Sequence, residues 1–273
     1  FMLRLHARVR GQATVIKTGE YLFDGEVSPA DVLDRLVAGR VVTYDLTLPE
    51  GLTFAEILEL LRSSETLEFD VEGMDASNAL DRLGVGEGHA EGHAKGWFFP
   101  DTYRFERGHA ASSILARAYG AMVAALDEIW RTSEPTHGLA NPYEVLIMAS
   151  LIEKESAARE DRRRISGVFA RRLRLGMRLQ TDPTVIYGLG DSFDGNLTRR
   201  HLAEDGPYNT YRRHGLPPTP IASPGRDALL AAVQPDDGDA LYFVARGDGT
   251  SHFSATLAEH QEAVRRFQLG GGQ

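Results

Sequence analysis

The sequence predicts an α+β fold in which helices dominate. Long apolar or amphipathic segments lie in the middle of the chain, at residues 112–130 and 143–155, whereas alternating apolar and polar residues mark short strands near both ends. These elements do not follow the regular strand–helix–strand order that builds a doubly wound parallel sheet. We therefore expect strands at the N-terminus, a helical middle and a C-terminal part of strands followed by a helix.

The N-terminal segment shows the alternation most clearly. Residues 3–23 alternate between apolar and polar side chains, which predicts two strands around Gly11–Gln12, with a turn at Thr18–Gly19. This segment opens a small unit of strands and helices that we assign to residues 1–64. The rest of the chain, residues 65–273, is expected to form a second, larger domain.

Capping signals place the next elements. Ser28, Pro29 and Asp31 are typical of a helix start, and Gly39 of a helix end. A strand is expected at residues 41–48. Thr53 with a glutamate three residues later predicts a capping box, and hence a second helix.

The connector at residues 84–93 is rich in glycine and histidine. His89 and His93 lie four residues apart with Glu87 and Glu91 close by, a spacing that could ligate a metal ion on a helix. The glycines oppose a helix there. We favour a solvated connector without a metal, and the metal site is the alternative.

The remaining elements follow from apolar periodicity and turn residues. An amphipathic helix spans residues 112–130, and Pro142 begins the central helix. Further elements are expected in this order: a helix at 165–175, a short helix at 184–187, a helix at 227–233, a strand at 240–245, a hairpin turn at Asp248–Gly249, a strand around 252–254 and a closing helix at 256–267.

Composition excludes several classes of function. A net charge of −9 argues against a general nucleic-acid-binding protein. The absence of cysteine excludes disulfides, cysteine-ligated zinc and thiol catalysis. No apolar run is long enough to cross a bilayer, which takes about 18 residues or more.

Two carboxylates near the middle of the predicted central helix point in different directions. At about 100° per residue, Glu155 continues the face of Met148, Leu151 and Ile152, whereas Glu153 projects about 160° away. A carboxyl group beside an apolar face is desolvated, and a raised pKa would let it act as a general acid. The alternative is a boundary glutamate paired with a basic residue at i+4, Arg159.

Three loops carry side chains suited to carbohydrate. Aromatic residues are dense at 97–103, where they could stack on sugar rings or plug the loop onto the core. We expect Trp97 and Phe98 inside, and Asp101 and Tyr103 toward a substrate. The polar loop at 178–187 and the stiff, proline-rich segment at 208–221 supply the others.

Five ordered blocks resemble one family. They are KGWFFPDTYRF (95–105), LIEKES (151–156), VFARRLRLGMRLQTDPTVIYGLG (168–190), YNTYRRHGLPPTPIASPG (208–225) and LYFVARGDGTSHFSATLAEH (241–260). Together they resemble the membrane-anchored endolytic murein transglycosylases, the MltG or YceG-like family, over nearly the whole chain.

The resemblance implies a domain plan and a place in the cell. Residues 1–64 would form a LysM-like module and residues 65–273 the YceG-like catalytic domain. A membrane anchor would precede Phe1, so that the catalytic part acts on the periplasmic side of the bacterial inner membrane. The implied partners are peptidoglycan glycan strands and, by analogy, cell-wall synthases, with no nucleic acid.

The resemblance also implies the chemistry. Lytic transglycosylases cleave the β-1,4 bond between N-acetylmuramic acid and N-acetylglucosamine, leave a 1,6-anhydro end and use one glutamate as acid and then base, without cofactor or metal. In the family this ends the growth of nascent strands. Carried onto this sequence, the catalytic pair is Glu155 and Asn209, and the substrate contacts are Asp101, Tyr103, Gln180, Asp182, Tyr187, Tyr208 and Tyr211.

Two other functions stay open at this point. A glycan-binding or assembly protein would need the aromatic loops and no acidic catalyst. A small-molecule lyase using pyridoxal phosphate would need a suitably placed lysine, and the chain has only Lys17, Lys95 and Lys154.

Overall fold

The computed structural model describes residues 2–85, 92–133 and 138–269. The expected α+β class is confirmed: the described residues are mainly helical and contain small two-stranded sheets. Glu87, His89 and Glu91, on which the metal alternative for the connector depended, lie outside the described residues.

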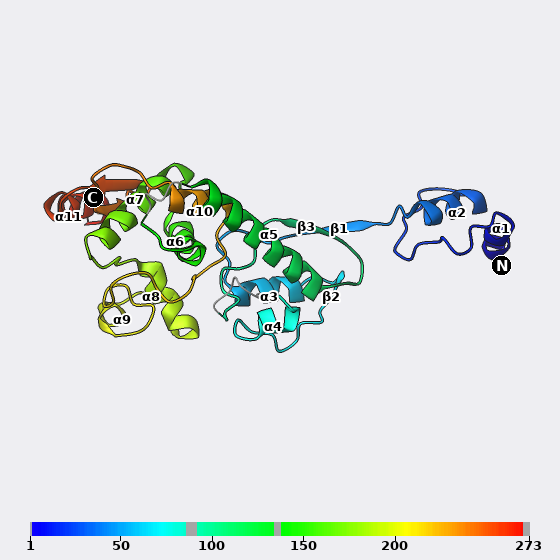
Figure 1. Ribbon diagram of the computed structural model, residues 1–273, viewed down its shortest axis with the longest axis horizontal. Helices are drawn as coiled ribbons and strands as arrows, with labels where there is room; N and C mark the ends of the chain where they lie inside the picture. Colours follow the sequence, from blue (N-terminus) through cyan, green and yellow to red (C-terminus); the bar gives the residue numbers. More distant parts are fainter. Residues whose placement is uncertain (1, 86–91, 134–137, 270–273) are drawn as a thin grey trace.

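The elements follow one another as shown in Figure 1. The helices are α1 (Met2–Val9), α2 (Pro29–Ala38), α3 (Phe54–Arg62), α4 (Ala79–Leu83), α5 (Ala111–Thr132), α6 (Pro142–Glu155), α7 (Arg162–Arg174), α8 (Asp182–Leu189), α9 (Arg199–Ala203), α10 (Arg226–Val233) and α11 (Leu257–Val264), which continues as a π-helical turn, η4 (Arg265–Leu269). The strands are β1 (Thr43–Thr47), β2 (Leu67–Glu68), β3 (Thr102–Glu106), β4 (His109–Ala110), β5 (Tyr242–Ala245) and β6 (Ser251–Ser254).

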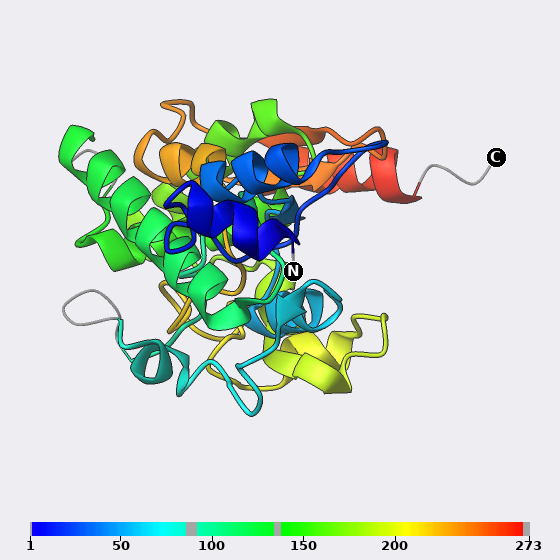
Figure 2. The same cartoon turned by 90° about the vertical axis from the view of Figure 1, so that its right-hand side faces the viewer.

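The prediction of two strands within residues 3–23 is wrong. Residues 2–9 form helix α1, and no strand follows before β1 in the part of the chain that the structure describes. A strand needs an edge to pair with, and α1 instead packs on α2, which buries Ala7 and Leu33. Figure 1 shows this helix pair standing apart from the rest of the molecule, at the end of the ribbon that contains β1, and Figure 2 views the molecule from that end.

Helices α2 and α3 begin as the capping signals predict. The side chains of Ser28 and Thr53 each accept a hydrogen bond from the backbone N–H three residues on. In return, the carboxylates of Asp31 and Glu56 accept the backbone N–H of the cap residue. Gly39 ends α2 in the left-handed conformation, at φ 64°. The start of both helices and the end of α2 thus follow from residues close by in the sequence.

The strand pairings cross the predicted domain boundary. β1 runs antiparallel to β3, with Tyr44 opposite Phe105, so a strand from residues 1–64 pairs with one from residues 65–273. β2 and β4 form a short parallel pair, and β5 and β6 an antiparallel hairpin. The division at residue 64 stays a prediction.

The aromatic loop after the connector packs into the core through Trp97 and Phe98, as predicted for these two residues. Trp97 and Phe98 are buried, and the Phe98 ring stacks on Phe54 of α3 with centroids 5.0 Å apart. Trp97 lies parallel to Tyr143 at the start of α6, at 6.1 Å. The loop thereby joins the α3 side of the core to α6.

Helix α6 is the centre of the larger part of the molecule. Every residue from Val145 to Ile152 is buried, because α5, α7, α8 and α10 pack around the helix. A helix that is apolar on all sides is stable only in such surroundings. Its last turn emerges from this packing and carries Glu153 and Glu155. None of the described helices is both long and apolar enough to cross a membrane.

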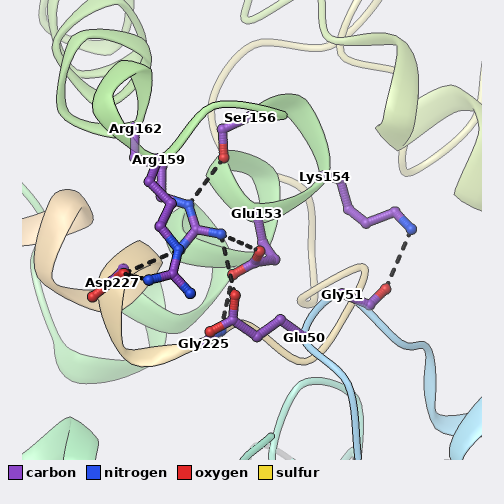
Figure 3. A network of polar contacts seen from close by, with 9 residues as sticks. All are labelled: Glu50, Gly51, Glu153, Lys154, Ser156, Arg159, Arg162, Gly225 and Asp227. Carbon is purple, nitrogen blue, oxygen red and sulfur yellow. Dashed lines mark hydrogen bonds and ion pairs between the residues drawn. The ribbon is translucent and has the colours of Figure 1, made fainter. Parts of the chain in front are cut away.

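A buried ion pair fixes this last turn (Figure 3). Arg162 Nη2 lies 2.7 Å from Glu153 Oε1 and 3.2 Å from Glu50 Oε2. The Gly225 N–H donates to Glu153 Oε2 at 2.9 Å, and a side chain at Gly225 would collide with the Glu50 carboxylate. The network therefore joins the end of α6 to the turn after β1, to α7 and to the start of α10.

Replacing Arg162 tests how much this ion pair stabilises the fold. Arg162→Met leaves the Glu153 carboxylate buried without its cation, and we expect the free energy of unfolding to fall by about 3 kcal/mol. Urea denaturation followed by circular dichroism measures the loss.

The matched control is Arg159→Met. Arg159 pairs at 3.5 Å with the exposed carboxylate of Asp227, so its removal should cost no more than about 0.5 kcal/mol. Equal losses from the two variants would contradict a special role for the buried pair.

Candidate active site

Glu155 lies at the end of α6 and lines a cavity of about 510 Å³. Ser156 leaves the helical conformation immediately after it, so the carboxyl group sits where the helix opens toward the cavity. Glu153 does not line this cavity and points to the ion pair described above. The two carboxylates therefore occupy different surroundings, as their spacing on the helix requires.

The surroundings of Glu155 favour its protonated form. Desolvation raises the pKa of Glu155 to about 7, and the negative charge of Asp182 adds to this shift. A hydrogen bond from the Thr181 hydroxyl to Oε1 opposes the shift without cancelling it. Among the described residues no basic side chain forms an ion pair with Glu155, and Arg159, the alternative partner at i+4, lies beside Asp227 instead.

One wall of the cavity comes from the loop before α8. Gln180, Asp182 and Tyr211, three of the residues predicted to contact the substrate, line the cavity together with Glu155. The Tyr211 hydroxyl donates to Asp182 Oδ1 at 2.5 Å. Gln180 holds a left-handed backbone conformation, φ 52°, which a residue other than glycine rarely adopts, and its N–H donates to Thr210 O at 3.2 Å.

Buried threonines lock this loop in place. Thr210 Oγ1 accepts the Thr181 N–H at 3.1 Å and lies 2.9 Å from Thr184 Oγ1. The hydroxyl of Thr181 is thereby held toward Glu155. Sequence reasoning missed these threonines, since nothing in their spacing shows that residues 181 and 210 meet.

The opposite wall comes from α7, β5 and α11. Arg172, Tyr242 and His260 line the cavity there, and none of them was among the sequence-based candidates. The Arg172 guanidinium lies 5.0 Å from the centre of the Tyr242 ring, and Tyr242 stacks on His260 at 5.2 Å. All three lie in the blocks that carry the family resemblance, at residues 168–190 and 241–260, but apolar periodicity and motif spacing do not single out a buried arginine or its neighbours.

Tyr187 and Tyr208 form a separate cluster that does not line the cavity of Glu155. Their rings meet edge to face with centroids 5.0 Å apart, and Lys95 Nζ lies 5.4 Å from both centroids. Lys95 Nζ also donates to the Tyr208 hydroxyl at 3.1 Å, and that hydroxyl lies 2.7 Å from Thr219 Oγ1. The cluster joins the aromatic loop, α8 and the proline-rich segment.

Asn209 is occupied by the backbone of its own loop. Its Nδ2 donates to the carbonyl oxygens of His201, Leu202 and Glu204, the last at 2.6 Å, and its Oδ1 accepts the Tyr211 N–H at 2.9 Å. The side chain is buried and does not line the cavity of Glu155. This geometry suits a residue that shapes the loop and positions Tyr211.

Asp101 and Tyr103 lie away from the cavity of Glu155, on the β1–β3 ribbon. Asp101 is exposed and accepts the N–H of Thr102 at 2.7 Å. Tyr103, expected to face a substrate, is buried in the core, and its hydroxyl donates to Phe99 O at 2.6 Å. The alternation of the strand, which points every second residue inward, explains this placement.

In the ranges that the structure describes, no three histidine, aspartate or glutamate side chains converge as metal ligands would.

Known proteins resemble this chain throughout its length. The model of the YceG-like family matches residues 1–266. An endolytic murein transglycosylase of Bacillus subtilis (strain 168) is 38% identical over 173 residues, covering 63% of this chain and 48% of that protein. A protein of the same name from Streptococcus pneumoniae serotype 2 is 30% identical over 284 aligned residues, covering 92% and 50%.

A solved structure agrees. The 2.6 Å crystal structure of a YceG-like protein from Listeria monocytogenes superimposes with a TM-score of 0.64 and 28% identity, covering 96% of this chain and 88% of that one. The chain spans about half the length of the two relatives from Bacillus and Streptococcus. Since the family model matches nearly every residue, the chain belongs to the YceG-like family.

Proposed function

We propose that this chain is the catalytic part of a peptidoglycan lytic transglycosylase. It would cleave the β-1,4 bond between N-acetylmuramic acid and N-acetylglucosamine within glycan strands and leave 1,6-anhydro ends. The names of the relatives support this reaction. The observation that carries the proposal is Glu155, a carboxyl group with a pKa of about 7 that lines a cavity and has no cationic partner among the described residues.

A single carboxyl group suffices for this reaction. Protonated Glu155 donates its proton to the bridging oxygen as the C1–O4 bond breaks, and the developing positive charge spreads over C1 and the ring oxygen. The resulting carboxylate takes the proton of the C6 hydroxyl while O6 bonds to C1. The 1,6-anhydro ring closes, Glu155 is protonated again, and no water is consumed.

The other residues divide by their distance from this chemistry. Gln180, Asp182 and Tyr211 share the cavity with Glu155, and we assign them to substrate binding. Asn209 acts through the Tyr211 backbone as a positioning residue. The cluster of Tyr187 and Tyr208 offers a second place for sugar rings, beyond the cavity.

The setting of the enzyme is part of the same proposal. A membrane anchor outside this sequence would hold the catalytic part at the outer face of the bacterial inner membrane, where it ends the growth of nascent strands. The LysM-like module that we assign to residues 1–64 would add a glycan-binding role, with β1 joining it to β3 of the catalytic part.

Replacing each carboxylate in turn tests the catalytic assignment. Glu155→Gln keeps an acceptor for the Thr181 hydroxyl and loses the proton donor, so we expect the yield of anhydro-ended fragments from purified murein to fall by about 10²- to 10⁴-fold. Mass spectrometry of the released sugars measures it.

The matched control is Glu153→Gln, two residues away. It weakens the ion pair with Arg162 and should lower the stability while the anhydro product persists. A non-catalytic glycan-binding protein would give no anhydro product with either variant or with the native chain.

The pH dependence of the rate follows from the raised pKa of Glu155. The reaction starts from the protonated form, which is lost as the pH rises through about 7. We expect kcat/KM to fall about tenfold per pH unit above that value. A rate that stays level from pH 6 to pH 9 would contradict Glu155 as the acid.

Stability should respond to pH at lower values than the rate does. The pKa of Glu155 is higher in the folded chain than its ordinary value of 4.5, so stability is greatest while the group is protonated in both states, declines as the pH rises from about 4.5 to about 7, and levels off above that. Glu155→Gln removes this decline. We expect the variant to be more stable than the native chain by about 2 kcal/mol at pH 8, and nearly equal to it at pH 4.5, in urea denaturation.

A further inference from the structure

The cavity of Glu155 also contains a buried arginine. Arg172 on α7 lines it beside Gln180, and only 7% of the residue is exposed. Burying a guanidinium is costly unless its charge and its N–H groups are compensated. The partners of Arg172 therefore show whether a negative charge or a hydrogen-bond acceptor is missing from the site.

The partners of Arg172 are all neutral. Its Nε donates to Leu241 O at 2.7 Å, and its Nη1 donates to Leu179 O at 2.7 Å and to Arg178 O at 3.2 Å. The Gln180 side-chain oxygen lies at 3.4 Å. No described carboxylate forms an ion pair with Arg172, and no described residue accepts a hydrogen bond from Nη2.

The neighbours of Arg172 do not supply the missing negative charge. Tyr242 lies under the guanidinium, and His260 stacks on Tyr242. Burial and then the charge of Arg172 lower the pKa of His260. His260 Nδ1 is buried with no hydrogen-bond partner among the described residues. This end of the cavity is thus cationic, and Arg172 Nη2 is a donor that no described residue uses.

Arg171, the preceding residue, shows the contrast. Its guanidinium also donates to backbone carbonyls, from Nε to Ala240 O at 2.8 Å and from Nη1 to Asp236 O at 2.7 Å. It faces a different cavity, where the acidic side chains of Asp236, Asp237 and Asp239 offset its charge. Both arginines hold backbone carbonyls, and Nη2 of Arg171 is also without a described partner. They differ in charge compensation, because aspartates act on Arg171 and no carboxylate is among the groups that act on Arg172.

We propose that Arg172 binds a carboxylate of the substrate, beside the sugar whose glycosidic bond Glu155 breaks. The inference rests on the proposed function and adds that the enzyme selects strands that carry a carboxylate. The sugar rings of a murein strand are uncharged, so the carboxylate comes from a stem peptide or, where that peptide has been removed, from the lactyl group of N-acetylmuramic acid. Nη2 donates to the carboxylate, which a guanidinium suits better than an ammonium does.

The first test needs only the native chain. Steady-state kcat/KM is measured on four preparations of murein strands: with stem peptides, with the peptide carboxylates converted to carboxamides, with the peptides removed, and with the peptides removed and the lactyl carboxylates converted to amides. We expect one neutralised preparation to be cleaved about 10- to 100-fold less efficiently than its charged parent, mainly through KM. The pair that shows the difference identifies the carboxylate.

The second test compares the two arginines. Arg172→Lys keeps a positive charge near the carbonyls of residues 178 and 179 and loses the planar fork, so the preference for the charged strands should fall about tenfold or more. Arg171→Lys makes the same change outside this cavity and should leave the preference unaltered. Circular dichroism confirms that both variants are folded.

The outcomes separate this inference from the proposed function. Equal cleavage of charged and neutralised strands would overturn the role of Arg172 and leave the transglycosylase intact. If no strand yields anhydro product, binding of the four preparations to the Glu155→Gln variant, measured by calorimetry, still decides whether the cavity selects a carboxylate. Should Arg172→Lys fail to fold, the native preference alone decides.

Discussion

The structure depends on the way charge is divided at the last turn of α6. Two carboxylates leave this turn in nearly opposite directions, and a single buried arginine can neutralise only the one that it faces. Arg162 pairs with Glu153, which leaves Glu155 beside apolar residues and the negative Asp182. Burial raises the pKa of Glu153 as well, but there the Gly225 N–H and the charge of Arg162 oppose the shift, whereas no cation opposes it at Glu155.

The same ion pair explains why the position of Glu155 is well defined. Arg162, Glu50 and Gly225 come from α7, from the turn after β1 and from the start of α10, and all of them converge on Glu153. Glu155 follows Glu153 by two residues, so contacts from three parts of the chain hold the turn that carries it. A catalytic group gains from rigid support of this kind, since small displacements of a proton donor cost rate.

The sequence predicts the parts of the molecule that local rules decide. Caps at Ser28 and Thr53, and the direction of Glu155 on its helix, follow from spacing alone. Residues 2–9 were misread because alternation predicts a strand only where a neighbouring strand exists. Arg172 was missed because its partners are backbone carbonyls at 178, 179 and 241, and sequence spacing gives no sign that they meet.

The cavity combines a neutral acid and an uncompensated cation, and this combination constrains the substrate. Desolvation is the largest influence on the pKa of Glu155, and Arg172 is not among the groups that shift it. Arg172 acts on Tyr242, Tyr211 and His260. Tyr211, which also interacts with Glu155, lies between the two groups. A ligand that satisfies both presents an uncharged glycosidic oxygen at one end and an anionic group at the other, which a sugar carrying an acidic substituent does and an unsubstituted glycan does not.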